Sequence, residues 1–335
     1  MTALESVRAL RPTRRGLGVA AVAVLAFAMG AAAGARSLNA VVVPGLVGLA
    51  ASAYQLARAD VPSVQRSTPD PGFAGERRRV TVDVESDVPC TVRERVDGGV
   101  SVDGGTPSVT VGHGGRFAYE VELRRRGDHA LGPATCRLTD SLGLFSREVE
   151  TDAATAALVY PDVYAVEGEQ VAGLVRRALG HDRSSFDRLR EFSAGDTMRD
   201  IHWTASAKRP AEEFVVAEYR SQSEATHVEV VGESALGSAD TMASTVASVA
   251  THLHDAGVTV TVTIPAGRVV AHPGDAGSLL RLLALTDDGW VEDEARATAD
   301  VTVLGEGGDA TVSVADREVA LERLLGGHRG REVMA

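Results

Sequence analysis

The sequence from Phe186 to Arg220 reads FDRLREFSAGDTMRDIHWTASAKRPAEEFVVAEYR, and it separates two different folding patterns. It mixes arginines with acidic side chains, and it contains Trp203, one of only 2 tryptophans, and Lys208, the only lysine of the chain. Before this stretch, apolar residues recur with a period of two, which is typical of half-buried strands. After it, strand patterns alternate with helix patterns. We therefore expect it to join a β domain to an α/β domain.

Composition limits the classes of function that the chain can have. Its 335 residues suffice for about two domains of ordinary size. A net charge of -12 argues against general nucleic-acid binding, which needs a basic face. The acidic excess is typical of a halophilic protein kept soluble in high salt, although a high-GC genome also favours arginine over lysine. Cys90 and Cys136 are too few for a disulfide framework, so we expect two buried thiols rather than one isolated bridge.

Two uncharged runs near the N-terminus predict a transmembrane hairpin. Residues 16–35 and residues 40–57 carry no charge, and each run is about long enough to span hydrocarbon as a helix. Residues 36–39 between them leave room only for a tight turn. The alanine and glycine content lets two such helices approach closely in lipid. We assign residues 1–58 to an N-terminal tail and this hairpin.

The arginines before the first run predict the orientation of the hairpin. Arg8, Arg11, Arg14 and Arg15 precede it, against a single acidic residue, Glu5. By the positive-inside rule the N-terminus is cytoplasmic, and two spans return the rest of the chain to the cytoplasm. The predicted location is the cell membrane, multi-pass. The alternative is a signal peptide over residues 1–35, but the apolar run is long for that purpose and a second one follows at once.

An antiparallel β-sandwich is predicted for residues 77–165, after a linker at residues 59–76 that is rich in proline and glycine. Val80, Val82 and Val84 alternate with polar residues, as in a half-buried strand. Several short strands separated by Gly-rich turns are typical of a sandwich. The further strands are expected at residues 91–96, 107–111, 116–123, 134–139 and 157–164. Residues 126–133 are expected to form a turn.

An α/β domain is predicted for residues 166–325, with a polar tail at 326–335. Its expected strands are residues 227–231, 258–264 and 301–304, and a short helix is expected at 171–179. Ser238 or Asp240 is expected to cap a helix that Gly257 ends, and Asp275 to cap a second, leucine-rich helix. This alternation indicates a mostly parallel sheet with helices on its faces.

The sequence contains no recognisable catalytic or metal-binding motif. It has no Gly-rich phosphate loop, no Gly-x-Ser-x-Gly elbow and no His-Glu-x-x-His. His252 and His254 are two apart on one predicted helix and do not share a face. The two cysteines have no neighbouring histidine with zinc-ligand spacing. We therefore expect no catalytic, cofactor-binding or metal-ligating residues, and an enzyme is disfavoured.

The charged stretch allows three interpretations. Gly195 supplies a turn, and Asp196 can cap a short helix that carries Arg199 and Trp203. The favoured interpretation is an ion-pair network that braces the connection between the domains. The alternatives are a docking surface for a partner protein, since Arg and Trp are common interface anchors, and a catalytic dyad using Asp196 or Glu191. The positions expected to brace or dock are Arg190, Glu191, Gly195, Asp196, Arg199, Ile201, Trp203, Ser206, Lys208 and Glu218.

The same stretch resembles the signature of the domain-of-unknown-function 58 family, R-E-Y-x-x-G-D-x-x-R-x-I-x-W-x-x-S-A-R. Residues 190–208 read REFSAGDTMRDIHWTASAK, with Phe192 in place of tyrosine and Lys208 in place of the final arginine. Further family features are the Arg-Gly-x-x-x-Leu-Gly-Pro segment at residues 126–133, the element at residues 140–145, Tyr160-Pro161 and the membrane hairpin. The resemblance covers essentially the whole chain.

The resemblance implies a von Willebrand factor A-like, Rossmann-like α/β domain downstream of the signature. In many members the first strand of that domain ends in Asp-x-Ser-x-Ser, whose side chains ligate a divalent metal. Here the corresponding residues are Gly232-Glu233-Ser234-Ala235-Leu236, which lack the aspartate and the second serine. Hard cations need oxygen ligands, so the departure predicts no metal site.

The resemblance also implies a partner, because family members are commonly encoded beside MoxR-type AAA+ ATPases. We therefore expect a non-enzymatic, membrane-anchored scaffold or adaptor that works with such an ATPase in assembly or chaperoning. The alternatives are a metal-dependent or hydrolytic enzyme that uses the acidic residues of the 190–208 motif, and a purely structural membrane component. No nucleic acid, small-molecule substrate or cofactor is expected.

Overall fold

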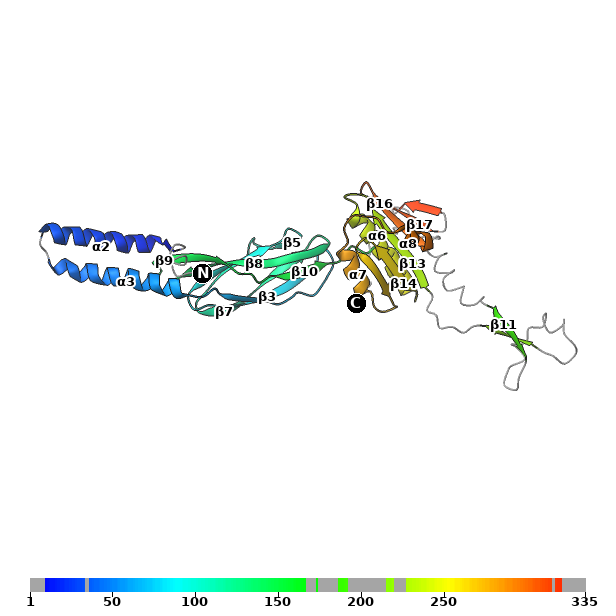
Figure 1. Ribbon diagram of the computed structural model, residues 1–335, viewed down its shortest axis with the longest axis horizontal. Coiled ribbons are helices and arrows are strands. Elements are labelled where there is room, and N and C mark those ends of the chain that lie inside the picture. Colours follow the sequence, from blue (N-terminus) through cyan, green and yellow to red (C-terminus); the bar gives the residue numbers. More distant parts are fainter. Residues whose placement is uncertain are drawn as a thin grey trace. The chain divides into compact units, whose positions relative to one another are not determined.

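The computed structural model describes residues 10–33, 36–166, 173, 186–191, 215–219, 227–314 and 317–320 (Figure 1). The chain divides into two compact units, Met1–Val159 and Tyr160–Ala335. The boundary lies a few residues before the predicted end of the sandwich domain at residue 165. The helix predicted at residues 171–179 and the tail predicted at residues 326–335 lie outside the described residues.

Two long helices begin the first unit, as the uncharged runs predict. Helix α2 (Arg14–Ala33) and helix α3 (Asn39–Arg58) are joined through the 3₁₀ turn η1 (Arg36–Leu38). Both are long and apolar enough to cross a membrane. Their large apolar side chains are exposed, whereas small residues such as Ala23 and Ala26 are buried between them. A Cβ atom added to Gly45 would lie 3.5 Å from the Cβ of Ala23, so small residues set the close approach of the helices.

The rest of the first unit is a β-sandwich of two antiparallel sheets, as predicted for this part of the chain. One sheet has the order β2-β3-β7-β5, and the other has the order β1-β9-β8-β4-β6 with β10 paired to β8. The first sheet consists of β2 (Ser63–Arg66), β3 (Arg77–Glu85), β7 (Gly114–Leu123) and β5 (Val100–Val102). The second consists of β1 (Arg11–Pro12), β9 (Phe145–Glu150), β8 (Gly127–Thr139), β4 (Cys90–Val96), β6 (Ser108–Val111) and β10 (Thr155–Val159).

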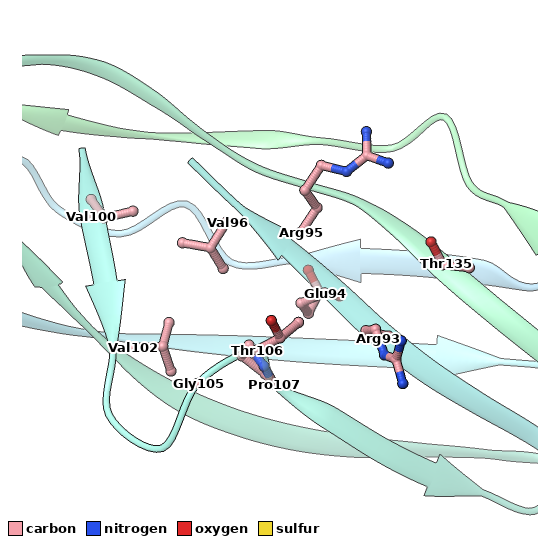
Figure 2. Close-up of a pocket in the computed structure, with 10 residues that line it drawn as sticks. All are labelled: Arg93, Glu94, Arg95, Val96, Val100, Val102, Gly105, Thr106, Pro107 and Thr135. Carbon is pink, nitrogen blue, oxygen red and sulfur yellow. The ribbon is translucent and has the colours of Figure 1, made fainter. Parts of the chain in front are cut away.

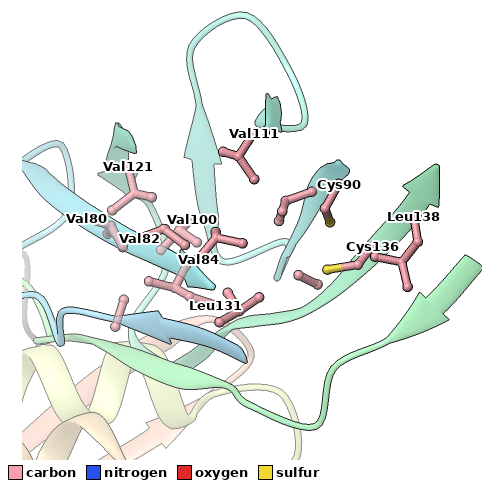
Figure 3. Close-up of a cluster of buried hydrophobic side chains, with 14 of the residues drawn as sticks. Val80, Val82, Val84, Cys90, Val100, Val111, Val121, Leu131, Cys136 and Leu138 are labelled. Carbon is pink, nitrogen blue, oxygen red and sulfur yellow. The ribbon is translucent and has the colours of Figure 1, made fainter. Parts of the chain in front are cut away.

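The sandwich core is made by the alternating apolar residues of both sheets. Val80, Val82 and Val84 of β3 are buried, and Figure 3 shows them in one cluster with Leu131 and Leu138 of β8. Alternation puts every second side chain of a strand on the core face, so β3 follows directly from its sequence. Cys90 and Cys136 are buried free thiols in the same core, as predicted.

Two predictions for this unit are wrong. Residues 126–133 do not form a turn, because β8 runs continuously from Gly127 to Thr139. Gly132 has a φ of 103° and lies where the register between β4 and β8 shifts, so glycine and proline here accompany an irregularity within a strand. Residues 59–76 are not only a linker, since β2 pairs with β3 along residues 63–66.

The second unit contains a mixed sheet with helices packed on it. The sheet order is β15-β14-β13-β16-β17-β18, with β13 (His227–Ser234) parallel to both β14 (Thr259–Ile264) and β16 (Val301–Glu306). The outer strands β15 (Gly267–Ala271), β17 (Asp309–Val314) and β18 (Arg317–Ala320) are antiparallel to their neighbours. The predicted mostly parallel sheet is therefore correct only for its centre.

Helix α6 (Ala239–Asp255) packs against the sheet through its predicted apolar face. Met242, Val246, Val249 and Leu253 are all buried. The other helices are α7 (Gly277–Ala284) and the short α8 (Asp293–Thr298). Ser238 is the N-cap residue of α6, as predicted, but its side chain makes no cap bond. The predicted cap of α7 is wrong, because its N-cap is Ala276 rather than Asp275.

Candidate functional site

The charged signature lies mostly outside the described residues. Of its positions, the structure describes the backbone of Arg190 and Glu191 on β11 (Phe186–Glu191) and of Glu218 on β12 (Val215–Tyr219). These strands pair antiparallel, with Glu218 opposite Arg188. Arg190 and Glu191 register with Val216 and Val215, so the backbone pairing does not test the brace interpretation. The positions that lie outside the described residues are Gly195, Asp196, Arg199, Ile201, Trp203, Ser206 and Lys208.

The carboxyl end of β13 carries the best-defined polar site of the second unit. Asp288 lies on the loop after α7, and its carboxylate accepts backbone N–H bonds from Gly237 at 2.7 Å, Ser238 at 3.1 Å and Ala239 at 2.8 Å. The hydroxyl of Ser234 donates a further bond at 3.3 Å. The N–H group of Gly237 is the largest cause of a lowered Asp288 pKa. Asp288 thus caps α6 from a distant part of the chain.

This arrangement does not fit a divalent metal. The hydroxyl of Ser234, at the carboxyl end of β13, is already bonded to Asp288. Both oxygens of Asp288 face N–H donors, whose positive ends repel a cation. Within the described ranges, no group of three or more His, Cys, Asp and Glu side chains is placed to hold a metal ion.

Glu233 fixes a second loop at the same edge of the sheet. It is buried, and its carboxylate forms a bidentate pair with Arg296 of α8, at 2.6 Å to Nη2 and 3.1 Å to Nε. It also accepts the backbone N–H of Val291 at 3.0 Å. A buried carboxylate needs such partners, and bidentate geometry restricts the loop between them. The sequence showed Glu233 only as a displaced metal ligand, because nothing local links it to Arg296.

Two large apolar side chains project from the loops that Asp288 and Glu233 hold. Trp290 is 61% exposed and Leu236 is 94% exposed. The loops are adjacent, since Ser234 and Gly289 form a β-bridge. Acidic residues surround the tryptophan in sequence, namely Asp287, Asp288, Glu292, Asp293 and Glu294. An exposed tryptophan on an ordered loop is typical of an interaction surface.

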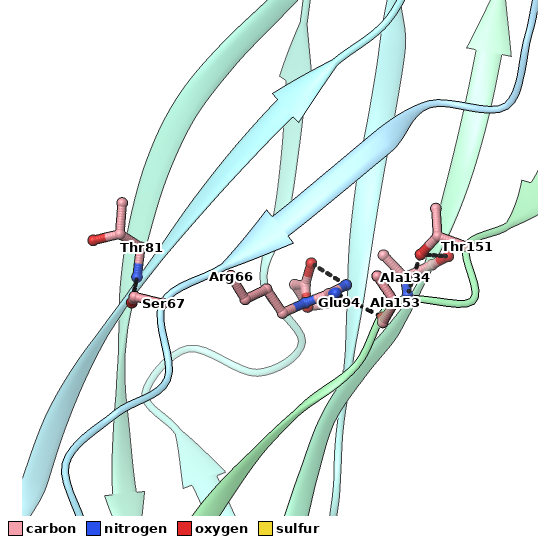
Figure 4. Close-up of polar contacts among 7 residues, drawn as sticks. All are labelled: Arg66, Ser67, Thr81, Glu94, Ala134, Thr151 and Ala153. Carbon is pink, nitrogen blue, oxygen red and sulfur yellow. Dashed lines mark hydrogen bonds and ion pairs between the residues drawn. The ribbon is translucent and has the colours of Figure 1, made fainter.

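The sandwich contains a buried ion pair between Arg66 of β2 and Glu94 of β4. Nε of Arg66 lies 2.8 Å from Oε2 of Glu94, and its Nη2 lies 3.1 Å from Oε1 (Figure 4). Nη1 of Arg66 donates to the carbonyl of Ala153 at 2.7 Å. Burial, and then the charge of Glu94, raises the pKa of the nearby Tyr119. The pair joins the two sheets, and Glu94 has no free oxygen for acid–base chemistry.

A depression of about 400 Å³ opens on the sandwich beside this pair. Figure 2 shows it between β4, β5 and the segment before β6, lined by the apolar Val96, Val100 and Val102 and the charged Arg93 and Arg95. Glu94 also lines it, but its carboxylate is committed to Arg66. The lining therefore provides no unpaired carboxylate and no thiol or imidazole that could act as a general base.

Comparison with known proteins adds no argument about the fold or the function of this chain. No family model matches the chain, and no curated protein matches it. Among matching solved structures, a chain of the human zinc α2-glycoprotein–prolactin-inducible protein complex has a TM-score of 0.23 and 11% identity, covering 30% of this chain and 96% of that chain. The CARDB domain of a Pyrococcus furiosus protein has a TM-score of 0.20 and 14% identity, covering 28% and 87%. The PKD domain of an M14-like peptidase from a Thermoplasmatales archaeon has a TM-score of 0.19 and 15% identity, covering 30% and 94%. Likenesses this low carry no functional argument.

Proposed function

We propose that this protein is a membrane-anchored, non-enzymatic adaptor related to the domain-of-unknown-function 58 family. Its hairpin spans the membrane, and its second unit is a von Willebrand factor A-like domain that binds a MoxR-type AAA+ ATPase in the cytoplasm. The observation that carries the binding role is the exposure of Trp290 and Leu236 on adjacent, well-fixed loops.

The family assignment is supported by sequence and by topology. The signature at residues 190–208 and the element at residues 140–145 carry the resemblance. The sheet of the second unit has a parallel centre, with β13 followed by α6 and flanked by β14 and β16. This is the arrangement expected of a Rossmann-like domain, in which ligands bind beyond the carboxyl ends of the strands. Leu236 follows the carboxyl end of β13 in sequence, and Trp290 is next to Gly289, which forms a β-bridge with Ser234 at that end.

The non-enzymatic role is supported by the partners of the buried carboxylates. Glu94 and Glu233 each pair with an arginine. Asp140, also buried, accepts backbone N–H bonds from Leu142 at 3.0 Å and Phe145 at 2.6 Å. A carboxylate held this way is a weak base and a poor nucleophile. The enzyme hypothesis therefore gains no support from the part of the chain that the structure describes.

Co-purification of the full-length protein with the ATPase tests the proposal. We expect Trp290→Ser combined with Leu236→Ser to weaken binding by roughly 30-fold or more, the loss typical of a central tryptophan anchor. Leu285→Ser is the matched control, because Leu285 is 45% exposed in the same unit but lies at the end of α7. Arg199→Ala combined with Asp196→Ala tests the signature separately. Undiminished binding by both double variants, with intact folding, would refute the adaptor role.

A further inference from the structure

The turn between β8 and β9, residues 140–144, contacts both helices of the hairpin. On the α2 side, the hydroxyl of Thr13 donates to the carbonyl of Gly143 at 2.6 Å, and its backbone N–H donates to that of Leu144 at 2.8 Å. A Cβ atom at Gly16 would overlap the carbonyl oxygen of Leu144, so the turn lies directly against the first turn of α2. The sandwich therefore packs against the hairpin and is not merely tethered to it.

The contacts on α3 extend well along the helix. The side-chain amide of Gln55 donates to the hydroxyl of Ser141 at 2.8 Å and accepts the N–H of Ser141 at 3.2 Å. Further along, a Cβ atom at Gly48 would lie 3.9 Å from Cδ1 of Leu142. Gly48 precedes the end of α3 at Arg58 by about 15 Å of helix, at a rise of 1.5 Å per residue. Leu142 thus lies beside the apolar span, not beyond its end.

Several backbone groups of the turn have hydrogen-bond partners within the protein. The N–H groups of Leu142 and Phe145 donate to the carboxylate of Asp140, and that of Gly143 donates to the Asp140 carbonyl at 2.9 Å. The carbonyls of Gly143 and Leu144 accept bonds from Thr13. Non-helical backbone at membrane depth is tolerated only when its polar groups have partners. Leu142, at the tip, is 58% exposed.

We propose that the turn at residues 140–144 enters the membrane interface beside the hairpin and that Leu142 contacts lipid acyl chains. The inference rests on the proposed membrane anchor, and the partner that the turn contacts is the lipid bilayer. Transfer of an exposed leucine side chain from water to an apolar medium is favourable, so the exposure of Leu142 at this depth fits contact with lipid. The sandwich is then held at a fixed height and orientation at the membrane surface.

Nitroxide labels on the full-length protein in phosphatidylcholine–phosphatidylglycerol vesicles test the inference. Single cysteines are placed at Leu142, at Leu25 in the middle of α2 and at Asp103, an exposed residue between β5 and β6. The native Cys90 and Cys136 are 0% exposed, so the wild type is the background control for labelling. Power-saturation EPR measures collisions of each label with oxygen, which partitions into lipid, and with a water-soluble nickel chelate.

We expect the labels at positions 25 and 142 to collide more often with oxygen than with the nickel chelate. Their collisions with nickel should be several-fold fewer than those of the label at position 103. If position 25 is in lipid while position 142 is as open to nickel as position 103, the turn does not enter the interface and only this inference fails. If position 25 is open to nickel, the membrane anchor itself fails. The two results are distinguishable in one set of samples.

Discussion

Removing the carboxylate of Glu94 should destabilise the sandwich more than any exposed substitution. The side chains of Arg66 and Glu94 are 1% and 0% exposed, and they share two hydrogen bonds. In Glu94→Ala the guanidinium of Arg66 stays buried with the Ala153 carbonyl as its remaining partner. An uncompensated buried charge of this kind costs about 3–5 kcal/mol.

A matched surface pair provides the control. Arg116 and Asp83 also form a short contact, at 2.6 Å, but their side chains are 72% and 46% exposed. Exposed pairs contribute about 0–1 kcal/mol, so Asp83→Ala should change stability little. Replacing both Arg66 and Glu94 by methionine should recover most of the loss, because no charge is then left unpaired.

Thermal unfolding of the full-length protein in detergent, followed by circular dichroism, measures the difference. For a domain of about 100 residues, 3 kcal/mol corresponds to a fall in midpoint of more than about 10 °C. Hydrogen exchange resolved by peptide assigns the loss to residues 59–159 rather than to the second unit. A Glu94→Ala variant as stable as Asp83→Ala, or a double methionine variant no better than Glu94→Ala, would refute the reasoning.

Two further predictions follow from local geometry, and a third from the distribution of arginines in the sequence. Gly16→Ala should lower the unfolding temperature of the full-length protein in detergent, because the added methyl group meets the carbonyl of Leu144. Gly18→Ala should not, because no atom lies within 4 Å of the added methyl group. Equal effects of the two variants would contradict the packing of the turn against α2. The pKa of Asp288 is lower in the folded than in the unfolded protein, so its carboxylate stabilises the second unit above the unfolded-state pKa of about 3.9. This stabilisation is lost as the pH falls through the folded-state pKa. Asp288→Asn should therefore make the stability of the second unit less dependent on acid pH, whereas Asp287→Asn should leave that dependence unchanged. A reporter enzyme that works only in the cytoplasm should be active when fused after residue 335. Activity of a reporter that works only outside the cytoplasm would contradict the predicted orientation.

Much of the fold follows from periodicity in the sequence. The alternation of Val80, Val82 and Val84 predicts β3, and the spacing of Met242, Val246, Val249 and Leu253 predicts the buried face of α6. These patterns succeed because one buried face dictates the side chains of each element. The two helices of the hairpin are likewise recognisable from their lack of charge.

The remaining features depend on contacts between distant residues. Gly132 and Pro133 resemble a turn locally, yet pairing with β4 on one side and β10 on the other keeps β8 extended. The cap of α6 comes from Asp288, which no local pattern around Ser238 reveals. Arg66 looks like part of a linker because its partner Glu94 lies on another sheet. The signature at residues 190–208 identifies a resemblance from sequence, and its role as brace or docking surface stays a prediction.

If a partner binds Trp290 as proposed, the Asp288 carboxylate links that binding to proton binding. The loop that carries Trp290 is the loop whose aspartate holds the first N–H groups of α6. A partner that binds Trp290 in this conformation favours the ionised form of Asp288. By reciprocity, protonation of Asp288 lowers the affinity for that partner. Because the pKa of Asp288 is lowered below its ordinary value, this linkage operates only in strong acid, and partner affinity should not change with pH in the neutral range.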